Sequence, residues 1–352
     1  MKCLDFSFIL LIVGSIIGAG FSSGQEIWAF FSSYGIYSYF IIILSSIFLY
    51  FIVKSLTKFG RTTNSKNIKD INKILFKNDK LFNALMLIGL FIFVCAMVAG
   101  LNSIGTLIFK NIRFPIFTII SLFFAFFICQ IGYNAIKRVN NILMPVVVIL
   151  LIFVAIFNLV VEFKTTSFND FNFLSLIKCL LMGLCYISYN IVFSSSLIVE
   201  NSNSFNKKQA KYNSLIISLI LGGLIFIINL ALINSNVVIS KTLPMLSLAF
   251  NINNVVGYVF GFILWFSVLT SLISSLYILV NNFKMNKFLS SAIILTLSFV
   301  FSSFGFNSIV NFVYPIQGVI GLIFIFKVFK FNIKQQTRKI KKPKIIGFYS
   351  KL

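Results

Sequence analysis

The sequence predicts an all-α polytopic membrane protein with ten transmembrane helices in a five-plus-five inverted repeat. Hydrophobic residues make up 59% of the chain and charged residues only 11%. Many apolar runs are about 20 residues long, which is the length that crosses a bilayer. Spans in the second half follow those in the first at an offset of about 170 residues. Because five is odd, two such halves must be inverted relative to each other.

Ten apolar runs, each bounded by charged or turn-forming residues, predict the individual spans. In order they cover residues 6–31, 36–58, 81–109, 115–135, 141–162, 174–198, 212–233, 255–280, 288–306 and 307–328. The division between the last two depends on the short stretch FGFNS, residues 304–308. We expect one transmembrane domain over residues 1–328, with inverted repeats of roughly 6–162 and 174–328, and a basic cytoplasmic tail over 329–352.

The positive charges predict the orientation of these spans. With ten spans and a cytoplasmic N-terminus, 25 of the 30 lysines and arginines fall on the cytoplasmic side. We therefore expect a multi-pass protein of the cytoplasmic membrane with both termini in the cytoplasm. The net charge of +23 lies in loops and tail, so the expected partners are anionic lipid head groups near the basic segments and not nucleic acid.

Several chemistries are excluded by residue types that the chain lacks. It contains no histidine, and its five cysteines do not cluster at metal-binding spacing. No nucleophile–base pair or phosphate-binding loop is present. The sequence thus predicts a protein that is not an enzyme and that has no cofactor, apart from Na⁺ or H⁺ as a coupling ion.

The first span carries the stretch GSIIGAGFSSGQEI, residues 14–27, where a simple anchor would carry leucine and valine. Gly18, Gly20 and Gly24 disfavour a helix, so we expect a break. Unpaired backbone at membrane depth is tolerated where it lines a cavity or binds a ligand. Free amides after the break suit a substrate carboxylate. The alternative is that the glycines only let helices pack closely.

The sixth span supplies the partner that an inverted repeat requires. Its polar stretch, GLCYISYNIVFSSS, lies about 170 residues after the glycines of the first span. Matching interruptions in the two halves indicate a transporter binding site, so we expect this helix to be interrupted too. Tyr186, Ser188, Tyr189 and Asn190 are its candidate ligands, and packing with interhelical hydrogen bonding is their alternative role.

Glu26 is the only acid well inside a predicted span. An ionised carboxylate there is costly unless it is paired or faces water, which makes the residue a functional candidate. It can hold a substrate ammonium group, bind a proton or pair at an outer gate. A structural hydrogen bond is the alternative.

The motifs resemble a known group of proteins. GSIIGAGF resembles the first-helix motif of the amino acid–polyamine–organocation superfamily, and IIGAGFSSGQEIWAFF resembles the YkvI-like membrane protein family within it. Further similarities are LCYISYN, VLTSLISSLY and NFVYPIQGVIG, in the same order along the chain. The chain departs from the pattern at Ser22-Ser23 and Ser274-Ser275. The resemblance implies a LeuT-type fold, with substrate held between interrupted first and sixth helices.

The resemblance also implies a function and a set of site residues. It implies a secondary active transporter of a small solute, in the first place an amino acid, coupled to sodium or protons by alternating access. The alternative is a non-transporting, solute-sensing membrane receptor of the same fold, like the germinant receptor subunits. The expected substrate-binding residues are Gly18, Ala19, Gly20, Phe21, Glu26, Tyr186, Ser188, Tyr189 and Asn190. The expected sodium ligands are Ile17, Gly20, Thr270 and Ser271; hydrogen bonding within the helix bundle is the alternative for the two hydroxyls.

Overall fold

The computed structural model describes residues 4–108, 115–161, 172–235 and 242–340, and these residues form helices and turns without any strand. Eight helical segments are long and apolar enough to cross a membrane. They are built on α4 (Tyr37–Thr63), α6 (Asp79–Ile108), α8 (Tyr133–Val161), α9 (Phe173–Ser202), α10 (Lys207–Ile233), α12 (Asn254–Asn281), α13 (Lys287–Phe301) and α15 (Tyr314–Ile340).

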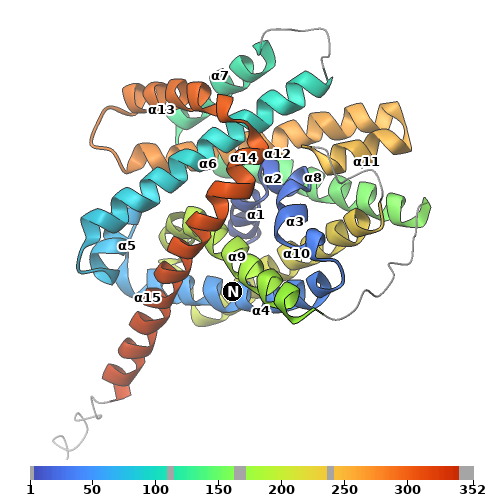
Figure 1. The fold of residues 1–352 in the computed structure, drawn as a ribbon. Coiled ribbons are helices and arrows are strands. Elements are labelled where there is room, and N and C mark those ends of the chain that lie inside the picture. The colour runs from blue at the N-terminus through green and yellow to red at the C-terminus, as the bar shows by residue number, and fades with distance from the viewer. Residues whose placement is uncertain (1–3, 109–114, 162–171, 236–241, 341–352) are drawn as a thin grey trace, which may run out of the picture.

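Two apolar helices are shorter, α1 (Phe6–Ile16) and α7 (Ile116–Ile131). The remaining elements are brief: α2 (Ala19–Ser22), α3 (Gln25–Phe30), η1 (Ser32–Tyr34), α5 (Ile68–Leu75), α11 (Pro244–Ile252), η2 (Ser302–Phe304), α14 (Phe306–Ser308) and the π-helical turn η3 (Ile309–Val313). In Figure 1, α1, α2 and α3 lie at the centre of the bundle, with α9 beside them and α15 running past the front.

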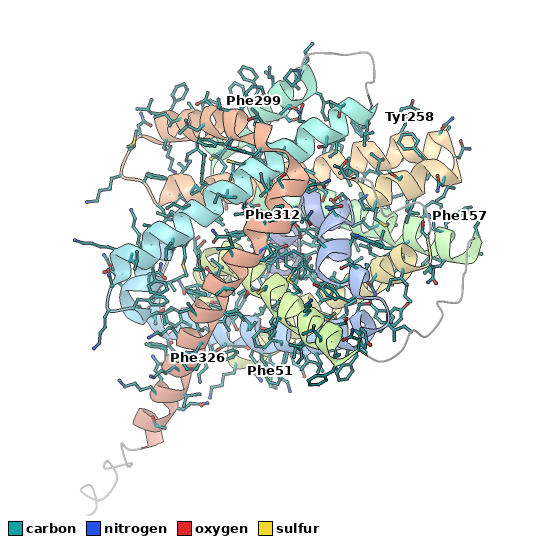
Figure 2. All side chains as sticks on the ribbon, in the orientation of Figure 1. Phe51, Phe157, Tyr258, Phe299, Phe312 and Phe326 are labelled. Carbon is teal, nitrogen blue, oxygen red and sulfur yellow. The ribbon has the colours of Figure 1, made fainter. Side chains whose placement is uncertain are left out.

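Burial separates inner helices from outer ones. In the most apolar stretch of α12, 83% of the residues are buried, against 28% in α13. The outer helices turn large apolar side chains outward, and Figure 2 labels Phe51, Phe157 and Phe326 at the rim of the molecule. A helix surface this apolar is stable in lipid and not in water, so the exposure pattern fits a membrane-embedded bundle.

Two predicted boundaries differ from the structure. The turn between the fourth and fifth predicted spans is at Gly132, which has a positive φ of 99°, so α8 begins before Lys137 and Arg138. The helix α15 continues through residues 329–340, which were predicted as tail. Residues 341–352 lie outside the described residues, and so do Lys2, Lys110, Arg113, Lys164 and Lys241, which were counted among the basic residues.

The predicted interruption of the sixth span is wrong, because α9 is one continuous helix from Phe173 to Ser202. Its polar side chains bond to carbonyls of their own helix: Ser188 Oγ to Cys185 O, Asn190 Nδ2 to Tyr186 O and Ser194 Oγ to Asn190 O. Such bonds satisfy the side chains without opening the ladder. No glycine or proline follows Gly183 within the helix, so nothing in the backbone forces a break.

Candidate binding site at the break in the first helix

The first helix loses its regular hydrogen-bond ladder at Ile17 and Gly18. The α1 ladder ends at Ile16, and α2 starts at Ala19. The Gly18 amide, which would donate to Gly14 O in a continuous helix, donates to Ile16 O at 2.9 Å instead. The Ala19 amide lies 3.4 Å from the Met97 sulfur on α6, which is a weak acceptor. The break therefore leaves backbone groups that need partners from elsewhere.

Hydroxyl groups of α12 supply partners for the freed carbonyls. Ser271 Oγ lies 2.9 Å from both Gly14 O and Ile17 O. Ser267 Oγ lies 2.9 Å from Ile17 O and 3.0 Å from Ser22 Oγ. Since α12 is the most buried of the long helices, its hydroxyls replace the water that would solvate these carbonyls at a surface.

The predicted sodium ligands are only partly brought together. Ser271 Oγ donates to Ile17 O at 2.9 Å. Thr270 Oγ1 donates to Ser267 O, at 2.9 Å, on its own helix. Gly20 O instead accepts from Ser23 Oγ at 3.2 Å.

Gly14 O, and not Gly20 O, is the second carbonyl in contact with Ser271 Oγ, and neither Gly14 O nor Ser267 was predicted from the sequence. Two signals were available. Gly14 precedes Ile17 by three residues and Ser267 precedes Ser271 by four, which are both about one helical turn, so each pair shares a helix face.

Two glycines of the first span have distinct structural roles. Gly24 adopts a positive φ of 81°, which separates α2 from α3, and the adjacent Ser23 carbonyl accepts from the Met245 amide of α11 at 2.8 Å. A Cβ on Gly20 would lie 2.1 Å from Glu26 Oε1. The Glu26 side chain thus folds back over Gly20, and any larger residue there would displace the carboxyl group.

Glu26 lies on α3 and is 1% exposed. Its carboxyl group lies next to the Tyr189 hydroxyl and interacts electrostatically with Tyr186 and Tyr314. Within the part of the chain that the structure describes, Glu26 Oε2 and the three phenol oxygens have no well-aligned hydrogen-bond partner. Four buried polar atoms in one cluster are therefore unsatisfied, which is rare in folded proteins.

Tyr314 comes from the far end of the chain and was not among the predicted ligands. It begins α15 directly after the π-helical turn η3, and its ring centroid is 4.7 Å from that of Tyr189. An extra residue in a helical turn rotates every side chain that follows it. Sequence periodicity assumes a regular helix and therefore did not place Tyr314 beside the first span.

The other predicted ligands of the sixth span are engaged elsewhere. Ser188 Oγ donates to Gly318 O of α15 at 2.6 Å, where the two helices approach closely. Asn190 Nδ2 donates to the backbone of its own helix. In the first span, Ala19 packs against Gly100 of α6, and Phe21 is fully buried. The predicted set thus divides into side chains at the carboxyl cluster, namely Tyr186 and Tyr189, and side chains whose hydrogen bonds or packing lie elsewhere.

Comparison with known proteins gives two relatives that cover nearly the whole chain. The uncharacterized protein YyaD of Bacillus subtilis (strain 168) is 26% identical over 326 residues, which is 90% of this chain and 93% of YyaD. The uncharacterized membrane protein YkvI of the same organism is 24% identical over 329 residues, with 89% and 92% covered. No protein-family model matches the chain.

Solved structures share the fold. MhsT in complex with L-phenylalanine superposes with a TM-score of 0.67 at 18% identity, covering 92% of this chain and 95% of MhsT. A mutant of the Eremococcus coleocola manganese transporter superposes with a TM-score of 0.59 at 13% identity, covering 93% and 77%. The chain is therefore similar along nearly its whole length to the membrane protein YkvI and to YyaD, and it has the LeuT-type fold.

Proposed function

We propose that this protein is a secondary active transporter of a small solute, in the first place an amino acid. The observation that carries the proposal is the break at Ile17 and Gly18. Hydroxyl groups of α12 donate to Gly14 O and Ile17 O at this break, and the buried acid Glu26 folds back over Gly20 just after it. A helix packed for stability alone has no need of freed backbone at membrane depth. The fold match to a structure that contains L-phenylalanine supports an amino acid as the solute.

Ten membrane crossings account best for this architecture. Besides the eight long segments, α1 to α3 together make one crossing and the shorter α7 makes another. This count gives two groups of five, inverted relative to each other, and keeps both termini in the cytoplasm. The basic loops then face the anionic head groups of the cytoplasmic membrane.

Sodium is the coupling ion that the site fits best. Three oxygens meet at the break, Gly14 O, Ile17 O and Ser271 Oγ, with 2.9 Å contacts. Ser267 O and Thr270 Oγ1, also 2.9 Å apart, follow on the same segment of α12. Hydroxyl and carbonyl oxygens are ligands of hard cations, and a neutral set suits a monovalent ion. Coupling to protons would instead depend on Glu26.

Uptake into proteoliposomes tests the proposal. We expect radiolabelled amino acids to accumulate above equilibrium when sodium is high outside, and to equilibrate without a gradient. The Ser271→Ala variant should lose the sodium dependence, while Ser274→Ala, one turn further along α12, should retain it. Binding without uptake would favour the solute-sensing receptor, and neither binding nor uptake across all 20 common amino acids would refute an amino acid as the solute.

A further inference from the structure

The side of the molecule where α5, α6 and α15 meet is strongly basic. Phe76, at the end of α5, stacks on Phe82 of α6 with ring centroids 3.7 Å apart, and Lys327 Nζ of α15 lies 5.9 Å from the centroid of the Phe76 ring. The short helix α5 therefore connects the other two, at the left of Figure 1. Residues 66–80 and 327–334, which we call the lysine corner, contain eight lysines and two aspartates.

The exposed lysines of the corner have no hydrogen bond or ion pair with any residue that the structure describes; they are Lys73, Lys77, Lys80, Lys330 and Lys334. One of the two aspartates, Asp70, accepts from the Lys66 amide at 3.4 Å. The positive charges repel one another, and the chain itself supplies little to offset them. An anion beside the corner would remove this repulsion.

The face of α15 that carries these lysines is apolar along the preceding turns. Ile316 and Ile323 are 62% and 44% exposed. Intervals of seven and four residues place them on one helix face with Lys327. On α5, Ile74 is 42% exposed next to Lys73. A soluble anion would need only the charges, whereas this sequence of apolar surface and lysines also matches the acyl chain of a lipid.

The inner face of α5 joins the lysine corner to the helix that holds the break in the first span. Ile68 and Ile71 are buried, and Lys69 Nζ donates to Asn282 O, directly after the last residue of α12. A positive charge at a helix C-terminus interacts favourably with the helix dipole. The placement of α5 therefore bears on α12, whose hydroxyls hold the carbonyls at the break.

We propose that the lysine corner binds an anionic phospholipid, whose phosphate lies beside the lysines and whose acyl chain lies along the apolar face of α15. The bound lipid holds α5 against α15 and, through Lys69, fixes the end of α12. The inference goes beyond the proposed transport function, because the lipid contacts no residue of the break in the first helix.

The start of α10 provides a matched comparison. It also carries three exposed lysines, Lys207, Lys208 and Lys211, but all three come from one end of one helix. An acidic residue lies close by, since the Asp5 amide donates to Asn213 Oδ1 of α10 at 3.0 Å. Basic residues attract anionic membranes in general. This helix therefore separates that general attraction from a site to which two distant segments contribute.

The experiment compares lipids that differ only in their head groups. The melting temperature of the full-length protein, purified in detergent and stripped of lipid, is measured with dioleoylphosphatidylglycerol or with dioleoylphosphatidylcholine. We expect the anionic lipid to raise the melting temperature more than the zwitterionic one. Inorganic phosphate and glycerol 3-phosphate should not raise it, because they have no acyl chain. Equal effects of the two lipids, or an equal effect of a soluble phosphate, would overturn the inference.

Variants locate the effect at the lysine corner. The combination of Lys73→Gln, Lys77→Gln and Lys330→Gln should weaken the apparent affinity for phosphatidylglycerol by at least about tenfold. The same three replacements at the start of α10 should change it by less than about twofold. Both variants should fold, because all six side chains are exposed. Unchanged affinity in the corner variant, or an equal loss in the α10 variant, would contradict the inference.

Hydrogen exchange reports on the lipid's effect on α5. Phosphatidylglycerol should slow the exchange of backbone amides in α5 and in the last turn of α12, and should leave the first turn of α10 unchanged. Unchanged exchange in α5 would refute its being held by lipid. None of these readouts requires transport, so a failure of the lipid site leaves the proposed function standing, and the reverse also holds.

Discussion

Replacing Ser271 with alanine should destabilise the protein by removing the hydroxyl that partners the broken first helix. Gly14 O has lost its helical donor, and Ser271 Oγ at 2.9 Å is the replacement. A buried carbonyl left without a donor costs about 1–3 kcal/mol. Interhelical hydrogen bonds in membranes average about 0.6 kcal/mol. We therefore expect Ser271→Ala to lower the free energy of unfolding by about 1–2 kcal/mol.

Ser267 and Ser271 share an acceptor, so their effects should not be additive. Both hydroxyls lie 2.9 Å from Ile17 O, and the one Ser271 proton is shared between Ile17 O and Gly14 O, so Ile17 O keeps a donor within reach when either hydroxyl is removed. The Ser267→Ala variant should lose only about 0.5 kcal/mol. The double variant leaves Ile17 O without either hydroxyl, and its loss should exceed the sum of the single losses by about 1 kcal/mol.

Equilibrium unfolding in detergent, with potassium replacing sodium, measures these differences. Ser274→Ala is the matched control, because the Ser274 hydroxyl is equally buried but donates to Thr270 O of its own helix at 2.9 Å. Its loss should be below about 0.5 kcal/mol. Equal stabilities of Ser271→Ala and Ser274→Ala, or strictly additive effects in the double variant, would refute the role of α12 in holding the break.

Three further predictions concern packing and ions. Sodium at 100 times its dissociation constant should stabilise the wild type by about 2.7 kcal/mol and Ser271→Ala far less. Thermal unfolding at constant ionic strength measures the two shifts, and equal shifts would contradict a sodium site at Ser271. Gly318→Ala should lower the free energy of unfolding by about 1–3 kcal/mol, because its Cβ would lie 2.5 Å from that of Cys185. Unfolding in detergent measures the loss against Gly223→Ala, whose Cβ would meet no atom within 4 Å, and equal stabilities would contradict this close approach of α9 and α15. Without ligand, Glu26→Gln should be at least as stable as the wild type, because the substitution removes the cost of burying an ionisable group. A clear loss of unfolding free energy in the same assay would indicate a structural role for Glu26.

The break in the first helix could be predicted because its causes are local. Glycines and serines at Gly14 to Gly24 lower helix propensity whatever surrounds them, and Gly24 requires its positive φ within a short segment. The polar stretch of α9 was misleading for a related reason. Serine and asparagine side chains can open a helix or bond back to its carbonyls, and the sequence alone does not separate the two outcomes.

The parts of the site that the sequence did not reveal depend on tertiary geometry. Tyr314 reaches Tyr189 only because a π-helical turn precedes it, and a regular 3.6-residue period does not contain that rotation. Ser267 was missed because its acceptor, Ile17 O, is 250 residues away in the chain. The contact of Ser271 Oγ with Gly14 O likewise depends on the direction of the freed carbonyl, which residue propensities do not determine.

Sodium-driven uptake is the most direct test of the central claim that the break in the first helix, held by α12, forms a transport site. The measurement is the initial rate of labelled solute entry into proteoliposomes, with an inward sodium gradient or with equimolar potassium, for wild type, Ser271→Ala and Ser274→Ala. Our account predicts sodium-dependent accumulation by the wild type and Ser274→Ala, and none by Ser271→Ala. Equal sodium-dependent accumulation by all three proteins would contradict it.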